Sequence, residues 1–571
     1  MQLNQEVPPR LTAHASLAIT LLCGSAWLGS GAAAQTPPNE AGQAWGSISP
    51  LPNTSTLPEG WQHGAFMEVF VRGYKDSNGD GIGDLRGLTQ QLDYLRDLGI
   101  KGLWLMPITA SADHDHGYAT TDFRALEPDY GSLDDLDELL RQAHARGIGV
   151  IMDYVLNHSA ASHPLFQQSA QGAGNRWRSW YVWREPGQQA DLKQWDIWGK
   201  NPWYQQLTDA NSDDGSRYFA TFGAAMPDFN LRLPEVQEFH RSSLRFWLNR
   251  GLDGFRLDAV PHLIENDAEH WNDQPESRQL TGEFSALIRS YPGRHVVCEA
   301  TANPSAYAAA EVCGSAFAFG HEGRIIKAAR GDRQAVADVA HFFETAPLSL
   351  ATMLSNHDIF AGQRAWDQFH GDEAAYKLAA ATYLLQPGTP FIYYGEEIGM
   401  AGVPGLAGDA PLRTPMSWRA PSRDPQAGFS KAAPYRPISP NAASHNVERE
   451  AGNPRSLLNF YKAMLKLRNT LPEIASGSYE QVRVDGLMTS FKRCQGAHCS
   501  IVAINYGRQA ATLRLDASAG SPQLQQRYPR EGQVLPTARN AGAARPAALR
   551  IKMAPRSVQV WRETSHINTQ P

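Results

Sequence analysis

The stretch "LRGLTQQLDYLRDLGIKGLWLMPI" at residues 85–108 predicts a helix followed by a buried strand. Leucines recur every three or four residues between Leu85 and Leu95, which is typical of one apolar helix face. Gly99 is suited to end that helix. The continuous apolar run after it is typical of a strand that is covered on both faces.

Similar segments follow along the chain. "LDDLDELLRQAHARG" reads as a helix before the strand-like "IGVIMDYVLNH", and "VQEFHRSSLRFWLNRG" precedes "LDGFRLDAV". "HVVCEA", "SAFAF", "LATMLSNHD" and "PFIYYGEEIGM" continue the series. About eight β-runs with helices between them predict an α/β fold, a (β/α)₈ TIM barrel.

Two regions depart from this alternation. Residues 154–228 are rich in Trp, Gln, Asn and Gly, and they are too long for an ordinary loop after the third strand. After the helix "SLLNFYKAMLKLRNTLP", short strands separated by turn residues predict an antiparallel β-sandwich. The predicted organisation is a signal peptide at 1–34, a leader at 35–60, barrel at 61–153, an inserted domain at 154–228, barrel at 229–472 and the sandwich at 473–571.

The first residues carry an export signal. Arg10 precedes the apolar stretch "LAITLLCGSAWLG", and "GAAAQ" offers a cleavage site before Gln35. This run is too short to span a membrane, and the sequence shows no candidate span after it. We therefore expect a periplasmic or secreted protein with no membrane span.

Composition limits the partners. The chain has 571 residues, of which 42% are hydrophobic and 19% charged, as is ordinary for a globular multidomain protein. Its net charge of −6 and the lack of a basic run give no support to a nucleic-acid surface. The oligomeric state cannot be read from the sequence.

Four cysteines remain if the signal peptide is removed, and an even number in an exported protein permits two disulfides. Pairing within Cys298–Cys313 and Cys494–Cys499 is the simplest of three connectivities, and the sequence alone does not choose among them.

Acidic residues end several of the apolar runs: Asp153, Asp258, Glu299 and Asp358. In a barrel the carboxyl ends of the strands face one shared mouth, so these groups should converge there. Converging carboxylates repel, and we expect the pKa of one of them to be raised. Such a set can hold a protonated acid beside an ionised nucleophile.

The loop "DSNGDGIGD" at residues 76–84 places oxygen-bearing side chains at alternate positions, as a calcium loop of the EF-hand type does. Position twelve of such a loop would be a bidentate Glu, but here it is Gly87. The residues before it favour a strand rather than a helix. We expect a structural calcium site between a strand and a helix, the alternative being an Asx-rich turn without metal.

The segments "DYVLNH", "MPDFN", "GFRLDAV", "CEA" and "LSNHD", in this order, resemble the conserved regions of the α-amylase family, glycoside hydrolase family 13. "GLWLMPI", "DHGYATTDF", "YYGEEIGM" and "RTPMSW" extend the resemblance over roughly residues 60–560. "MPDFN" is intermediate between the oligo-1,6-glucosidase-like and neopullulanase-like groups of that family.

The resemblance implies a role for each acid. Asp258 would be the nucleophile that forms a glucosyl-enzyme, and Glu299 the general acid and base. Asp358 would grip sugar hydroxyls and favour the distorted ring. Asp153 would support Arg256, whose charge would hold the carboxylate of Asp258 ionised.

Further contacts are implied by the same resemblance. His158 and His357 would donate hydrogen bonds to the sugar, Tyr118 would stack beneath its ring, and Asp115 would bind its hydroxyls. The calcium would be held by Asp76, Asn78, Asp80, the carbonyl of Ile82, and Asp84.

Some aromatic residues leave two interpretations open. His262 could line the acceptor side or pack. Trp195, Trp198 and Trp203 could stack on sugar faces or form the core of the inserted domain.

Ala259 resembles members of the family that act on α-1,4 bonds. We expect a retaining hydrolase of maltooligosaccharides or starch, with transglycosylation as a further outcome. The alternatives are a glucosyl transferase or isomerase of the trehalose synthase kind, and an α-glucosidase. A non-catalytic binding protein is disfavoured because all three catalytic carboxylates are present.

Overall fold

The computed structural model describes residues 46–51, 53, 55–205, 215–515, 523–535 and 549–564. The predicted signal peptide and the first part of the predicted leader lie outside the described residues. Within these ranges, no helix combines the length and apolar character that a membrane crossing requires.

Eight parallel strands form the central sheet, in the order β12-β11-β10-β9-β5-β2-β1-β13. A parallel bridge between Thr352 and Pro390 links the two ends of this order, so the sheet is a nearly closed barrel, as predicted. The strands are β1 (Phe66–Val69), β2 (Gly102–Leu105), β5 (Gly149–Val155), β9 (Gly254–Asp258), β10 (His295–Cys298), β11 (Ala316–Phe317), β12 (Leu350–Ala351) and β13 (Phe391–Tyr393).

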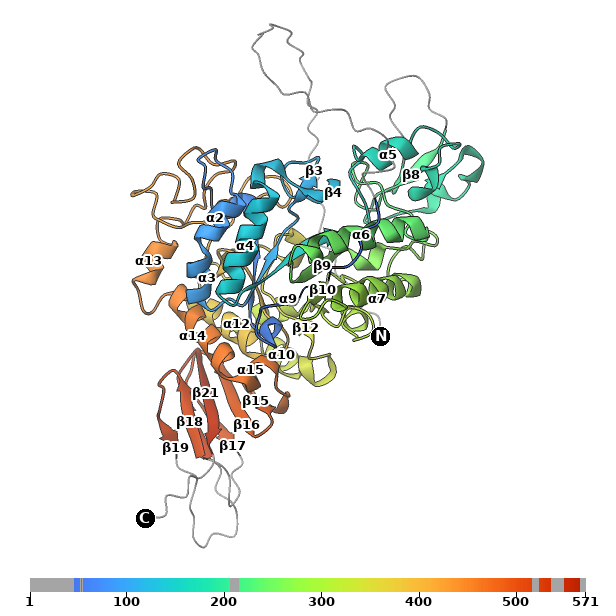
Figure 1. Cartoon of the computed structure of the whole chain (residues 1–571). Coiled ribbons are helices and arrows are strands. Elements are labelled where there is room, and N and C mark those ends of the chain that lie inside the picture. Colours follow the sequence, from blue (N-terminus) through green and yellow to red (C-terminus); the bar gives the residue numbers. More distant parts are fainter. Residues whose placement is uncertain are drawn as a thin grey trace. The chain divides into compact units, whose positions relative to one another are not determined.

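Helices alternate with these strands (Figure 1). In α4, Ser132 and Asp135 cap the amino end reciprocally, and one apolar face is buried. The α-helices are α1 (Val71–Tyr74), α2 (Leu85–Gln90), α3 (Leu92–Leu98), α4 (Leu133–Ala145), α5 (Pro164–Ser169), α6 (Pro234–Asn249), α7 (Pro275–Arg289), α8 (Pro304–Tyr307), α9 (His321–Ala329), α10 (Arg333–Thr345), α11 (Ala365–Gln368), α12 (Glu373–Leu385), α13 (Val447–Ala451), α14 (Leu457–Thr470) and α15 (Pro472–Ser476).

Eight short 3₁₀ helices complete the helical elements of the described residues: η1 (Trp61–His63), η2 (Pro128–Tyr130), η3 (Arg178–Trp180), η4 (Pro186–Gln188), η5 (Leu192–Gln194), η6 (Val260–His262), η7 (Ile359–Ala361) and η8 (Glu396–Ile398).

The first strand–helix unit differs in detail from the sequence expectation. The helix predicted after residue 85 is divided into α2 and α3, because Gln91 leaves helical geometry at φ −100°, ψ 4°. The apolar run "FMEVFVRGY" is a strand only as far as Val69, and its second half forms the single helical turn α1. The loop 76–84 therefore follows a helical turn rather than the strand itself.

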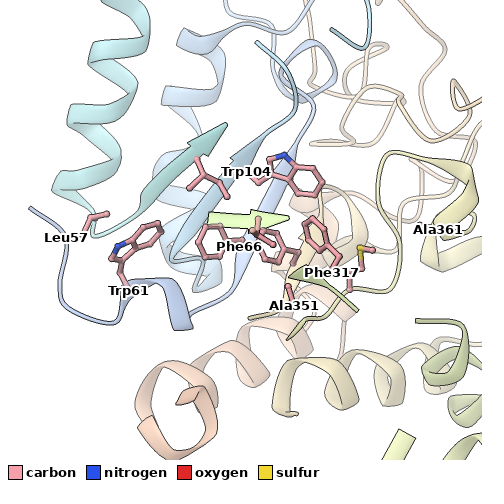
Figure 2. Packing of buried hydrophobic residues seen from close by; sticks show 11 residues of the cluster. Leu57, Trp61, Phe66, Trp104, Phe317, Ala351 and Ala361 are labelled. Carbon is pink, nitrogen blue, oxygen red and sulfur yellow. The ribbon is translucent and has the colours of Figure 1, made fainter. Parts of the chain in front are cut away.

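Large aromatic side chains fill the barrel interior (Figure 2). Phe66 stacks on Phe391 with ring centroids 4.8 Å apart, and Trp104 lies 5.3 Å from Phe317. Gly149 leaves the space that the Trp61 ring occupies, and a β-carbon there would collide with that ring. Burial of each such ring contributes about 2 kcal/mol to the stability of the fold. The packed interior therefore supports the carboxyl ends of the strands.

The predicted inserted segment carries an antiparallel sheet in the order β6-β8-β7. Its strands are β6 (Trp183–Arg184), β7 (Trp203–Gln205) and β8 (Arg217–Phe219), and a further antiparallel pair joins β3 (Thr109–Ser111) to β4 (Thr120–Leu126).

The C-terminal strands form two antiparallel sheets, β14-β15-β16-β21-β18-β19 and β17-β20 (Figure 1). Ile501 and Trp561 of the first share one apolar cluster with Leu513 and Ile551 of the second, as a sandwich requires. The strands are β14 (Glu480–Asp485), β15 (Met488–Gln495), β16 (His498–Asn505), β17 (Ala511–Leu515), β18 (Gln523–Tyr528), β19 (Val534–Leu535), β20 (Leu549–Met553) and β21 (Ser557–Thr564).

Both disulfides of the simplest connectivity are present: Cys298 is bonded to Cys313, and Cys494 to Cys499. The first closes a loop directly after β10. It therefore ties down the residue that precedes Glu299.

A buried carboxyl beside the barrel makes stability depend on pH. Glu396 accepts hydrogen bonds from the hydroxyls of Tyr383 (2.6 Å) and Tyr461 (2.7 Å), yet burial raises its pKa to about 8. Between the ordinary value of 4.5 and about 8, the folded chain holds a proton that the unfolded chain releases. Its contribution to stability is therefore complete below pH 4.5 and is lost as the pH rises through about 8.

We expect Glu396→Gln to remove this contribution. The difference in free energy of unfolding between variant and wild type should shift in favour of the variant from pH 5 to pH 9, measured by denaturant titration. A difference that stays constant over this range would contradict the prediction.

Candidate active site

Three carboxyl groups surround the guanidinium of Arg256 at the carboxyl ends of neighbouring strands. Arg256 Nη1 lies 2.8 Å from Asp153 Oδ1 and also contacts Asp258 Oδ1, and its Nη2 lies 3.0 Å from Glu299 Oε2. All four side chains are buried. The backbone N–H of Ala259 donates to Glu299 Oε2 at 3.0 Å.

Strand geometry brings these groups together. Arg256 and Asp258 are two residues apart on β9, so both point to the same side of the strand. Asp153 on β5 is paired in register with Arg256, and Glu299 follows β10 directly. The sequence prediction that these acids converge is confirmed in this geometry, while their chemical roles stay predictions.

Electrostatics in this cluster favour a bound proton. Burial raises the pKa of Asp258 well above its ordinary value, the charges of Glu299 and Asp153 add to that rise, and Arg256 opposes it. Burial likewise raises the pKa of Asp153. Because one cation faces three buried carboxyl groups, full ionisation of the cluster is disfavoured, and a shared proton is what an acid paired with a nucleophile requires.

Asp358 belongs to a second, more strongly ionised group. His357 Nε2 lies 3.0 Å from Asp358 Oδ2, and His357 Nδ1 lies 2.5 Å from Glu68 Oε1. Arg413 Nη2 donates to Asp358 Oδ1 at 2.7 Å. Burial alone would lower the pKa of His357, but the Asp358 and Glu68 carboxylates raise it to about 10. In turn His357 and Arg413 hold the pKa of Asp358 well below its ordinary value against the effect of burial.

Both groups border one cavity of about 580 Å³. Its walls combine barrel residues with residues of the inserted segment and of the long connection after η8. The lining residues are His116, Tyr118, His158, Trp198, Phe222, Met226, Asp258, Ala259, His262, Glu299, Thr301, Asp358, Phe360, Asp409 and Arg413.

Two of the predicted sugar-binding residues line this cavity. The hydroxyl of Tyr118 donates to Asp153 Oδ2 at 2.9 Å and lies 2.7 Å from His357 Nε2, which fixes its ring at the wall. Neither ring nitrogen of His158 has a well-formed hydrogen bond in the described chain. Burial lowers the pKa of His158 to about 3, so its neutral imidazole is available to a bound hydroxyl.

Three others lie behind the wall. Arg256 and His357 are held by carboxylates of the protein, and Asp115 pairs with Arg436 at 2.5 Å. Arg436 also donates to the carbonyl of Arg413 at 2.9 Å. The predicted direct sugar contacts of Asp115 and His357 therefore stay predictions, because in this structure both side chains are engaged within the protein.

Sequence reasoning missed several residues of the site. Arg413 pairs with Asp358 and with Asp409 (3.1 Å), and Glu68 supports His357. Arg413 opens the motif "RTPMSW", so a signal for it was present in the sequence. Glu68 lies inside a buried strand, and nothing in the neighbouring sequence indicates that its carboxylate has a polar partner.

The loop 76–84 holds its carboxylates within one turn. Asp76 accepts N–H groups of Gly79 (2.6 Å) and Gly81 (2.9 Å), and Asp84 accepts the N–H of Gly87 at 2.7 Å. These contacts leave further oxygen lone pairs, and an all-oxygen donor set suits a hard cation. Across the described ranges, however, no three His, Cys, Asp or Glu side chains gather into a metal-holding group. Calcium therefore stays a prediction.

In the part of the loop formed by residues 78–82, the side-chain oxygens of Asp80 also accept hydrogen bonds from within the turn. Asn78 Nδ2 donates to Asp80 Oδ2 at 2.9 Å, and the Ile82 N–H donates to Asp80 Oδ1 at 2.8 Å. The two side chains meet at the exposed edge of the turn.

Comparison with known proteins agrees with this geometry. Residues 68–477 match the family described as "Alpha amylase, catalytic domain", which covers more than half of the chain and includes every predicted catalytic acid. The chain belongs to the α-amylase family. It is accordingly an enzyme of that family, and the family implies an α-glucan-type substrate.

Two curated relatives indicate the range of activities nearby. The trehalose synthase/amylase TreS of Mycolicibacterium smegmatis is 33% identical over 487 residues, covering 75% of this chain and 79% of that protein. An α-glucosidase of Pediococcus pentosaceus is 30% identical over 515 residues, covering 76% and 89%. Among solved structures, the α-glucosyl transfer enzyme XgtA superposes with a TM-score of 0.74 at 26% identity, covering 88% of this chain and 99% of that chain.

Proposed function

We propose that this α-amylase-family enzyme takes an α-1,4-linked glucosyl unit from the end of a maltooligosaccharide and passes it to water or to another sugar. The observation that carries the proposal is the position of Asp258 and Glu299 on one guanidinium. Two carboxyl groups that contact the two amino groups of one guanidinium suit a double displacement with retention.

The reaction requires the shared proton on Glu299 and an ionised Asp258 beside Arg256, against the burial that raises the pKa of Asp258. Asp258, held beside Arg256, attacks the anomeric carbon, while the shared proton passes from Glu299 to the leaving oxygen. Asp358, kept ionised by Arg413 and His357, holds hydroxyls of the distorted ring. Glu299 then accepts a proton from the incoming water or sugar hydroxyl, which releases Asp258.

Attack on a chain end is supported by the wall beside Asp358. There Arg413 bridges Asp358 and Asp409, and the Asp115–Arg436 ion pair lies directly behind Arg413. A wall of paired charges suits the free hydroxyls of one terminal glucosyl unit better than a chain that continues past it. This narrows our first expectation, a retaining hydrolase of maltooligosaccharides or starch.

A defined substrate set tests the proposal. With maltotriose, we expect α-glucose and maltose first, with the anomer followed by NMR, and longer or rearranged products at high sugar concentration. Release of the β-anomer, or rapid attack on isomaltotriose alone, would contradict it. Accumulation of trehalose from maltose would select the isomerase reading, which the TreS relative favours.

We further propose that the chain is exported and that loop 76–84 holds a structural calcium, as members of the family often do. Asp76, Asn78, Asp80, the Ile82 carbonyl and Asp84 would be its ligands, outside the catalytic cavity. Chelation by EGTA should lower the melting temperature by several degrees, with recovery on adding Ca²⁺. Unfolding that does not respond to either addition would contradict the calcium site.

A further inference from the structure

Trp198 lies in a two-residue turn where the backbone disfavours tryptophan. Ile197 and Lys200 exchange both backbone hydrogen bonds, at 2.8 and 3.0 Å. Both central residues have positive φ, 51° at Trp198 and 81° at Gly199. Such a turn favours Asn, Asp or Gly, because a bulky side chain strains left-handed backbone. Local geometry therefore gives no reason for an indole at this position.

Trp198 differs in environment from its neighbours Trp195 and Trp203. Trp195 and Trp203 are 3% and 8% exposed and form a core with Phe219, so they pack. Trp198 is 62% exposed. A large apolar side chain held in the open by a strained turn is most readily explained by a ligand that covers it.

The indole of Trp198 borders the same cavity as Glu299. Its ring centroid lies 5.4 Å from that of His262, 5.5 Å from Trp271 and 5.7 Å from Phe222. The interplanar angles are 81°, 90° and 44°, so none of these rings stacks in parallel on the indole. No ring among these three therefore stacks on the indole face that a flat ligand would cover.

The cavity lining contains two chemically distinct groups of side chains. One carries the paired charges of Asp358 and Arg413, and the other the apolar rings around Trp198. Glu299 accepts the N–H of Ala259, which is the residue immediately before η6 and His262. The proposed general acid is therefore anchored beside η6, whose His262 is one of the rings around Trp198. Since this acid protonates the leaving oxygen, the leaving sugar should extend toward Trp198.

A polar partner for that sugar is also present. His262 is buried at the cavity wall, and its Nδ1 has no hydrogen-bond partner among the described residues. Burial lowers the pKa of His262 to about 4, so the ring is neutral at pH 7 and can serve one hydroxyl. A pyranose offers both an apolar C–H face for an indole and a hydroxyl for this nitrogen.

We propose that Trp198 is the platform for the second sugar, first as the leaving group and then as the acceptor, and that it sets the ratio of transfer to hydrolysis. This rests on the proposed function. In transfer, the acceptor hydroxyl oxygen bonds to the anomeric carbon as the bond to Asp258 breaks, and the hydroxyl proton passes to Glu299. Without the platform, water takes the acceptor's place.

Two substrates separate this role from general damage. Maltose has a sugar leaving group, whereas the fluoride of α-glucosyl fluoride is too small to reach Trp198. In Trp198→Ala, kcat/KM for maltose should fall at least about ten-fold more than for α-glucosyl fluoride, and transfer products from added maltose should fall relative to released glucose. Equal losses on both substrates, with an unchanged transfer ratio, would overturn the role of Trp198.

Two further variants distinguish loss of the Trp198 indole from a general loss of stability. Trp198→Asn suits the left-handed turn, so it should melt no lower than wild type yet lose transfer as Trp198→Ala does. Retained transfer in this variant would overturn the platform. Trp177→Ala removes a half-buried indole of the inserted segment that does not border the cavity. This variant should leave kcat/KM for both substrates unchanged. Wild-type enzyme inactive on both substrates would instead overturn the proposed function itself.

Discussion

Replacement of Asp258 by Asn is expected to lower kcat on maltotriose by at least about 10⁴-fold, because the amide cannot form the glucosyl-enzyme. The side chain keeps its size, and Arg256 keeps its contacts with Asp153 and Glu299. The loss should therefore occur without a comparable fall in melting temperature. Activity would be followed by glucose release and stability by thermal unfolding.

A matched control and a covalent label make this result specific. Asp332→Asn, at the amino cap of α10, replaces one good capping residue by another and should leave the rate unchanged. A fluorinated glucosyl fluoride that slows breakdown of the intermediate should add its glycosyl mass to the peptide that contains Asp258. A label on another peptide, or a variant that keeps more than a few per cent of wild-type activity, would refute the role of Asp258.

Arg256→Met should cost both stability and activity. The variant leaves Asp153, Asp258 and Glu299 buried without their common cation, for which about 3–5 kcal/mol of destabilisation is expected. Loss of the positive charge raises the pKa of Asp153 and of Asp258 further. The acidic limb of the kcat/KM profile should consequently move to higher pH, and activity at pH 7 should fall by at least about 100-fold.

The pH profile distinguishes this from simple loss of packing. Arg468→Met removes another buried guanidinium, but its partners are the carbonyls of His63, Leu384 and Gly388 rather than carboxylates. It should destabilise the fold without moving the acidic limb. Arg256→Lys keeps a charge with less reach and should recover part of the activity. An unshifted profile in Arg256→Met would show that Arg256 has no electrostatic role.

Much of the architecture could be predicted because it is encoded locally. The leucine spacing from residue 85 and the apolar run to 108 already describe a helix–strand repeat, and the acids at the carboxyl ends of β5, β9 and β10 occupy equivalent places in that repeat. Periodicity depends only on neighbours in the chain, so a single sequence is sufficient to read it. The division of α2 from α3 was not visible, since one residue's backbone angles decide it.

The environment of each aromatic residue could not be predicted in this way. Trp195, Trp198 and Trp203 lie within nine residues of sequence, so the local amino-acid composition does not distinguish them. The path of one tight turn exposes the middle indole at the cavity and buries the other two.

The sequence by itself predicted the barrel and the family, and it marked the acids at the carboxyl ends of the strands. The tertiary structure alone decided their partners: His357 meets Glu68 across 289 residues, Asp358 meets Arg413 across 55, and Asp115 meets Arg436 across 321. The physical reason is that backbone periodicity is a property of adjacent residues. Which charges face one another depends on barrel closure and on the course of long connections, and Coulomb energy acts on distance in space rather than along the chain.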